Sequence, residues 1–368
     1  MASTNEINLS SSPHSFSKLG TGNTMLMVII ALLPLCVKGV FLYGLSAFLV
    51  ILTSIISCVA AEALFQLATK QKIRTKDCSA IVTGILLALV CPPSVPLWQV
   101  ALGGIFAIIV AKEFFGGIGA NVFNPALAGR AFMFVSFPTT MGATWLTPAK
   151  ATAINYVEAT SAATSAATSA ATSAATSAAT SAATGAVSAA TGVATEPVVE
   201  EVVDAISSST LLSRIGEAEL TTQNYWDFFF GNRAGCIGES SILLILIAFV
   251  FLSVTRIIDW KTPLTMVATV AIATLIAGGD VLMSVMAGGL LFGAVFMITD
   301  YATTPVTMWG RIIFAFGCGL ITFLIRQFGG YPEGVMFSIL IMNAVAPFLN
   351  RFVPRKYGYG KEKKAGTK

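Results

Sequence analysis

The chain has 368 residues, of which 55% are hydrophobic and only 11% are charged, and its formal net charge is +4. Its mean hydropathy of +0.80 excludes an ordinary water-soluble enzyme of this length, which would expose far more charge. We therefore expect an all-α polytopic membrane protein, with the lipid bilayer as a partner and no nucleic acid among its ligands.

Ten apolar stretches along the chain are candidates for membrane helices, because a hydrocarbon core of roughly 30 Å needs about 20 mostly apolar residues per crossing. The third and fourth stretches are short and meet at Cys91–Pro96, where three prolines force a turn. The ten stretches are 24–40, 43–66, 79–93, 97–112, 122–138, 240–256, 263–279, 281–299, 311–327 and 334–352.

Basic residues predict the orientation of these crossings. An even number of crossings puts both termini on one side, and 16 of the 22 Lys and Arg residues then fall on that side, against five on the other. Short cytoplasmic loops are enriched in Lys and Arg, so we expect both termini to be cytoplasmic. The remaining basic residue, Arg130, falls inside an apolar stretch.

Four regions follow from this pattern. Two membrane halves, 1–138 and 240–352, flank an extracytoplasmic loop at 139–239, and a basic cytoplasmic tail occupies 353–368. The loop has nine acidic and three basic residues, and within it the unit Ser-Ala-Ala-Thr recurs six times up to Thr184, with a seventh copy ending at Thr191. Small side chains bury little apolar area, so composition favours an inert spacer. The alternative is that one threonine is a modification site.

The two membrane halves contain similar stretches. Gly103-Gly104 leads to Asn124-Pro125 and Arg130, and Gly288-Gly289 leads to Thr304-Pro305 and Arg311. Five crossings per half give the halves opposite orientations, that is, two inverted five-helix repeats. Interrupted segments at matching positions of inverted halves mark binding sites near the middle of the membrane, which points to 116–130 and 300–311.

Two asparagine side chains are the main polar groups of the first segment, 116–130. Asn121 and Asn124 follow a glycine-rich turn, and their spacing puts both on one face, where they can serve a planar ligand with polar edges. The equally weighted alternative is that they cap backbone groups at an interhelical turn. Arg130 is either a ligand contact or the partner of a carboxylate, with the structural role slightly favoured.

In the second place, Asp300, Thr303 and Thr304 can serve an ion path or cap a helix. We expect Glu62, near the cytoplasmic end of its stretch, at the membrane interface. The six cysteines show no metal-ligand spacing, so we expect them to be packing residues, and no metal site is assigned.

Four motifs in this order resemble the RnfD family, a homologue of the NqrB subunit of the sodium-pumping NADH:quinone oxidoreductase. The motifs are Ser11–His14, the glycine-rich segment with Asn121–Ala126, Gly231–Glu239 and Thr299–Pro305. The resemblance covers nearly the whole chain apart from the Ser-Ala-Ala-Thr repeat.

This resemblance implies a multi-pass subunit of the Rnf complex in the bacterial inner membrane. That complex couples electron transfer between ferredoxin and NAD to movement of Na⁺ or H⁺, and the implied partners are RnfA, RnfB, RnfC, RnfE and RnfG. It also implies a urea-transporter-like fold, a covalent FMN linked by a phosphoester to a loop threonine, and a non-covalent riboflavin in the membrane domain. Asn121 and Asn124 suit the edge of that second flavin.

The FMN-bearing threonine has three candidates, because the chain departs from the family pattern of Asp, two residues, Ser or Thr, Gly or Ala, Ala and Thr. Thr210 is preferred, since its segment keeps the Asp, the hydroxyl and a following Leu but lacks the preceding Ala. Thr164 comes second, with Glu in place of Asp, and Thr191 third, with no acidic residue.

Two other functional classes stay open. Inverted five-helix repeats with Asn-Pro turns also occur in solute channels and transporters, and a structural anchor with an external arm would need no cofactor. No iron–sulfur or nicotinamide motif is present, so a redox role requires partner subunits for donor and acceptor.

Overall fold

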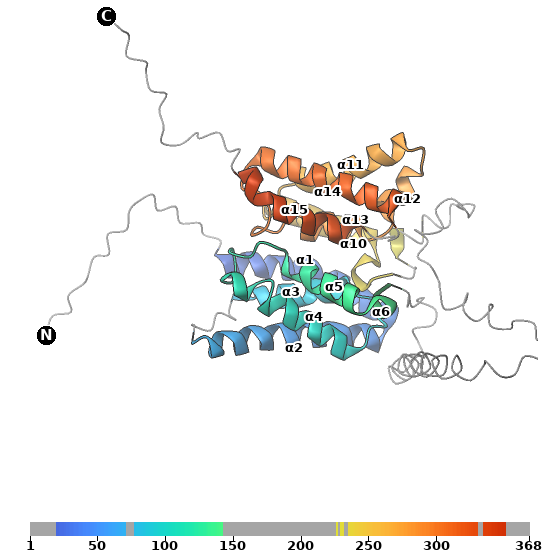
Figure 1. The fold of residues 1–368 in the computed structure, drawn as a ribbon. Helices are drawn as coiled ribbons and strands as arrows, with labels where there is room; N and C mark the ends of the chain where they lie inside the picture. The colour runs from blue at the N-terminus through green and yellow to red at the C-terminus, as the bar shows by residue number, and fades with distance from the viewer. Residues whose placement is uncertain are drawn as a thin grey trace, which may run out of the picture.

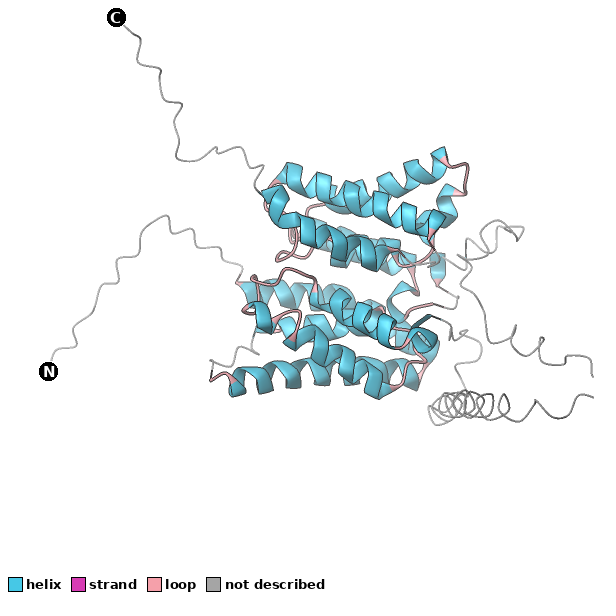
Figure 2. Cartoon of the chain, viewed as in Figure 1, coloured by secondary structure: helices cyan, strands magenta, loops and turns pink. Residues whose placement is uncertain are grey.

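The computed structural model describes residues 20–70, 77–142, 226, 229–231, 235–329 and 334–350. These residues form helices joined by short loops, with no strand among them (Figures 1 and 2). The longer helices are α1 (Thr21–Tyr43), α2 (Leu45–Ala68), α3 (Ser79–Leu89), α4 (Leu97–Ile109), α5 (Pro125–Ser136), α10 (Ile242–Val254), α11 (Lys261–Ile276), α14 (Met308–Phe328) and α15 (Val335–Leu349). The shorter ones are η2 (Glu113–Phe115), α6 (Pro138–Gly142), η5 (Ile237–Glu239), α12 (Val281–Met286), α13 (Leu290–Phe292) and the π-helical η6 (Gly293–Met297).

Helix length and an apolar exterior confirm the multi-pass membrane character. Among the described residues, four spans are long and apolar enough to cross a bilayer, namely Thr21–Tyr43, Leu45–Ala68, Leu97–Phe115 and Met308–Phe328, and α3, α10, α11 and α15 are shorter apolar helices. Their outward side chains are large hydrophobic groups such as Phe41, which is 84% exposed, and Ile276, which is 82% exposed. Lipid is the solvent that such a surface requires. The number of ten crossings stays a prediction.

Helices of each half pack mainly against one another, as two groups in Figure 1. In the first half α2 packs against α3 and α4, and α4 against α5; in the second half α11 packs against α14 and α12, and α14 against α15. Glycines allow the closest approaches: a Cβ added at Gly84 of α3 would lie 2.8 Å from the Ile55 Cα of α2, and one at Gly319 of α14 would lie 2.8 Å from the Met266 carbonyl of α11. Small residues at helix interfaces are the usual means of close packing in membranes.

The two halves meet along a limited set of elements. Helix α1 contacts α10 and η5, α3 contacts η5, and α5 contacts α15. Phe134 of α5 and Phe337 of α15 form an edge-to-face pair with ring centroids 6.0 Å apart. Most of the 139–239 loop between the halves lies outside the described residues, as does the 353–368 tail.

The prediction of one continuous helix over 281–299 is wrong. The stretch 281–299 is divided into α12, α13 and η6, because Gly288 and Gly289 both adopt a positive φ, of 66° and 63°, which ends α12 and redirects the chain. The Arg326 guanidinium holds this break by donating hydrogen bonds to the carbonyls of Ser284, Ala287 and Gly288 at 2.7, 3.1 and 2.9 Å. Apolar length alone conceals such a break.

Candidate functional site: a pocket between the two halves

A pocket of about 100 Å³, partly open to the exterior, lies between elements of both halves. Its walls are mainly apolar, with a few amide, hydroxyl and charged groups among them, which is the usual composition of a small-molecule site. The apolar lining residues include Met25, Val28, Val82, Leu86, Ile118, Leu252, Ile257, Ile258, Val295 and Phe296. The polar ones are Ser79, Thr83, Lys112, Asn121, Asn124, Thr299, Asp300 and Tyr301.

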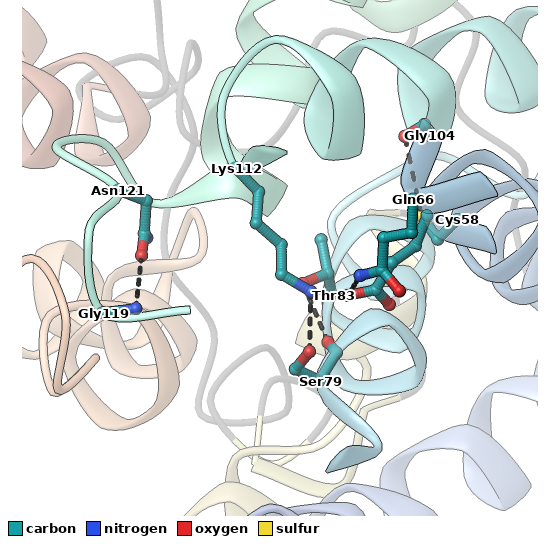
Figure 3. Close-up of polar contacts among 9 residues, drawn as sticks. Cys58, Gln66, Ser79, Thr83, Gly104, Lys112, Gly119 and Asn121 are labelled. Carbon is teal, nitrogen blue, oxygen red and sulfur yellow. Dashed lines mark hydrogen bonds and ion pairs between the residues drawn. The ribbon is translucent and has the colours of Figure 1, made fainter. Parts of the chain in front are cut away.

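The first wall is the glycine-rich loop between η2 and α5. Gly116, Gly117 and Gly119 have φ values of 108°, 88° and 87°, so this loop needs glycine at three places to turn the chain toward α5. Asn121 stabilises the turn, because its Oδ1 accepts a hydrogen bond from the Gly119 amide at 3.2 Å (Figure 3) and its Nδ2 donates to the Phe123 carbonyl at 3.2 Å. The side chain lines the pocket while 6% exposed.

Asn124 both caps a helix and lines the pocket. Its Oδ1 accepts hydrogen bonds from the amides of Ala126 at 3.1 Å and Leu127 at 3.3 Å, the two donors that an N-cap residue satisfies. Its Nδ2 donates to the Met297 carbonyl of η6 in the second half, at 3.4 Å. The capping interpretation is therefore confirmed for Asn124, and the same residue joins the two halves at the pocket.

The second wall comes from the segment between η6 and α14. Asp300 lines the pocket, and its Oδ1 accepts a hydrogen bond from the Ala302 amide at 3.4 Å. The Thr303 hydroxyl donates to Asp300 Oδ2 at 3.3 Å, so Thr303 orients the carboxylate from outside the pocket lining. Thr304 donates to the Asp300 carbonyl at 2.6 Å. Tyr301 donates from its hydroxyl to the Ile257 carbonyl, which fixes this segment against the end of α10.

The two places predicted from the sequence thus face one pocket. Asn121 and Asn124 come from 116–130, and Asp300 comes from 300–311. Arg130 lies elsewhere: it is buried in α5, outside this pocket lining, and its Nη2 donates to the Cys236 thiol at 3.5 Å. This contact connects α5 with the segment before η5. Thr210, Thr164 and Thr191 lie outside the described residues.

A buried ion pair completes the site, and the sequence interpretation missed it. Lys112 Nζ lies 2.7 Å from Glu62 Oε1 and donates a hydrogen bond to Ser79 Oγ at 2.6 Å (Figure 3). Both charged residues are 2% exposed and therefore buried between protein segments, while the interfacial position of Glu62 and the cytoplasmic side of Lys112 stay predictions. Glu62 in α2 and Lys112 in the segment between α4 and η2 neutralise each other, which makes burial tolerable. One charge of each sign near the same end of two apolar stretches, 43–66 and 97–112, was the available signal.

The lining fits a flavin ring, the cofactor that the resemblance implies. An isoalloxazine ring has apolar faces and polar edges, and the pocket provides aliphatic and aromatic walls together with the amides of Asn121 and Asn124. An amide nitrogen has two N–H donors, and the hydrogen bonds described above use one donor on each asparagine. A second donor on each side chain can therefore serve a ligand edge.

Known proteins with similar sequences cover almost the whole chain. The chain is 38% identical over 366 residues to the D subunit of the Na(+)-translocating ferredoxin:NAD(+) oxidoreductase complex of Acetobacterium woodii, which covers 98% of both proteins. It is 37% identical over 362 residues to the D subunit of the proton-translocating ferredoxin:NAD(+) oxidoreductase complex of Clostridium ljungdahlii, covering 96% of this chain and 97% of that protein. It is 32% identical over 372 residues to the D subunit of the ion-translocating oxidoreductase complex of Escherichia coli, covering 96% of this chain and 99% of that protein.

These relatives agree with a family match over residues 8–358, which extends through both membrane halves. The match includes the pocket residues of both walls and the intervening loop. The chain therefore belongs to the NQR2, RnfD, RnfE family.

Proposed function

We propose that this chain is the RnfD subunit of an ion-translocating ferredoxin:NAD oxidoreductase of the Rnf type, where it relays electrons through flavin and contributes to the coupled movement of a cation. The observation that carries the proposal is the 38% identity to the D subunit of such a complex over 98% of both chains. The chain is then an electron-carrying part of an oxidoreductase complex, and its partners are RnfA, RnfB, RnfC, RnfE and RnfG.

The proposal gives the chain two flavins. A covalent FMN is attached by a phosphoester to a threonine of the external loop, with Thr210 preferred over Thr164 and Thr191. A non-covalent riboflavin occupies the pocket, where Asn121 and Asn124 hold its polar edge and the aliphatic walls exclude water. A flavin supplies the capacity to accept and pass on electrons, while the protein fixes its position and the polarity around it.

In this proposal the two membrane halves are inverted five-helix repeats with a urea-transporter-like fold. Helix contacts support a pairing of α1 with α10, α2 with α11, α4 with α14 and α5 with α15, because α2 packs on α4 as α11 packs on α14. The halves touch through α1 with α10 and through α5 with α15, and contacts between equivalent elements are what a two-fold relationship produces. This pairing makes α4 equivalent to α14. The glycine and proline positions in the sequence instead make α4 equivalent to the segment one helix before α14.

The proposed location is the bacterial inner membrane, with both termini in the cytoplasm and the 139–239 loop outside. The coupling cation is Na⁺ or H⁺, and relatives named for each cation are 38% and 37% identical to this chain. Transport by the purified complex in sealed vesicles distinguishes the two. Uptake of radioactive sodium that persists when a protonophore is added indicates Na⁺, whereas acidification abolished by the protonophore, without sodium uptake, indicates H⁺.

Covalent flavin is the direct test of the redox role. The subunit, purified from cells that also express the flavin transferase, is expected to give a fluorescent band under ultraviolet light on a denaturing gel. A dark band from such cells would contradict the covalent FMN and favour a solute transporter with a similar fold.

A further inference from the structure

Three elements of the first half converge on the Lys112 ammonium at the edge of the pocket. Glu62 comes from α2. Ser79 begins α3, and Lys112 follows α4 just before η2 (Figure 3). Nζ contacts Glu62 Oε1 at 2.7 Å and Ser79 Oγ at 2.6 Å. These two bonds fix the ammonium in place, because a lysine side chain is otherwise long and flexible.

The position of this ion pair is unusual for a purely structural contact. Removing two charges from a high-dielectric solvent is costly, and a buried ion pair is commonly no more stabilising than apolar residues of the same volume. Lys112 and Ser79 both line the pocket, whereas Glu62 is not among its lining residues. The cation therefore faces the pocket, and its counter-ion lies behind it.

The ammonium retains a donor for a ligand. Lysine carries three N–H donors, and Glu62 and Ser79 accept two of them. The other charged group in the lining is Asp300, on the second wall, where the Ala302 amide and the Thr303 hydroxyl donate to its carboxylate. The neighbouring Glu113 is also buried, but it is not a lining residue. A ligand between the two walls thus has a fixed positive charge on one side.

We propose that Lys112, held by Glu62 and Ser79, sets the reduction potential of the redox ligand in this pocket. The inference rests on the proposed function, in which that ligand is a non-covalent riboflavin and the electrons come from the donor subunits of the complex. Each electron entering a neutral ring brings one negative charge, unless a proton follows it from water. A cation at the pocket wall stabilises that charge strongly because little water is present to screen it. Lys112 therefore favours the reduced ligand, and Glu62 moderates the effect.

Midpoint potentials of variant complexes test this inference. In a spectroelectrochemical titration of the non-covalent flavin in the purified complex, Lys112→Met is expected to lower the equilibrium constant of reduction at least tenfold, about 30 mV for a two-electron couple. The midpoint potential is expected to fall in Lys112→Met whether Glu62 stays charged or becomes protonated. Glu62→Gln is expected to raise the potential, and Lys112→Arg to keep it near the original value. The exposed Lys70 provides the control Lys70→Met, with no shift expected.

A double variant keeps the test decisive if Lys112→Met alone fails to assemble. Glu62→Gln with Lys112→Met removes both charges, and its flavin is expected to have a potential at least about 30 mV below that of Glu62→Gln alone. Equal potentials in these two variants, or an unchanged potential in Lys112→Met, would overturn the role of Lys112. Absence of non-covalent flavin from the unaltered complex is a different result, because it contradicts the proposed occupant of the pocket.

Discussion

The side-chain amide of Asn124 donates a hydrogen bond to the Met297 carbonyl at 3.4 Å, although the two residues are 173 positions apart. This bond joins the N-terminus of α5 to the π-helical η6 and so connects the membrane halves at the pocket. The same asparagine caps α5 through its oxygen. One side chain therefore positions a helix, an interface and a pocket wall.

The two roles of Asn124 are separable by substitution. Asn124→Ala removes both the cap and the interhalf bond, and loss of an N-cap costs about 0.5–2 kcal/mol. Asn124→Ser retains a capping oxygen but has no amide to reach Met297. We expect thermal unfolding of the detergent-solubilised protein to begin at a lower temperature for Asn124→Ala than for Asn124→Ser. Equal midpoints for the two variants would show that the cap contributes nothing measurable.

Close packing of α3 on α2 depends on Gly84. A Cβ there would lie 2.8 Å from Ile55 Cα and 3.0 Å from the Ser54 carbonyl, both backbone atoms that cannot move aside without shifting a helix. Overpacking of this kind costs about 1–3 kcal/mol, so Gly84→Ala is expected to lower the thermal midpoint. Gly142→Ala is the matched control, because its nearest contact would be Phe134 at an ordinary 3.7 Å. Equal midpoints for the two variants would argue against so close an approach of α3 to α2.

Arg326 is expected to hold the break between α12 and α13. Its three hydrogen bonds to the carbonyls of Ser284, Ala287 and Gly288 satisfy groups that a continuous helix would pair internally. Arg326→Met leaves those carbonyls without the guanidinium, and we expect faster amide hydrogen exchange across 284–293. Arg311→Met, which removes a half-exposed ion pair with Asp259, is expected to leave exchange in that segment unchanged. Unaltered exchange in Arg326→Met would mean that the glycines alone determine the break.

Intact mass measurement of threonine variants identifies the FMN attachment point. Thr210→Ala is expected to give an intact mass lower by one FMN beyond the substitution itself, with loss of the fluorescent band. Thr164→Ala and Thr191→Ala are expected to retain the flavin and serve as matched controls. Retention of FMN by Thr210→Ala, with loss in one of the other two, would move the site to that threonine.

The sequence predicted an all-helical membrane protein because apolar runs recur along the chain, and it pointed to both pocket walls because glycine and proline interrupt those runs. Asn121, Asn124 and Asp300 were found in this way. The division of 281–299 was missed, since the residues on either side of Gly288-Gly289 are apolar enough to belong to one helix. The hydrophobic pattern of a sequence does not predict where a glycine adopts a positive φ.

Long-range pairing explains the contacts that the sequence interpretation did not predict. Glu62 and Lys112 are 50 positions apart, and each is near the end of an apolar stretch, where an interfacial position is the ordinary expectation. Only the packing of α2 against α4 and α3 brings the two charges together. Arg130 was recognised as costly to bury, but its contact with the Cys236 thiol depends on the path of the segment before η5, which no local pattern encodes.

Non-covalent flavin content tests the central claim most directly. Flavin is extracted with acid from the purified complex, separated from the protein-bound FMN and quantified by fluorescence for the unaltered protein, for Asn121→Ala with Asn124→Ala, and for the control Asn350→Ala outside the pocket lining. We predict a stoichiometric non-covalent flavin in the unaltered complex and in the control, and its loss from the double variant. Unchanged flavin in the double variant would contradict the assignment of this pocket as the flavin site.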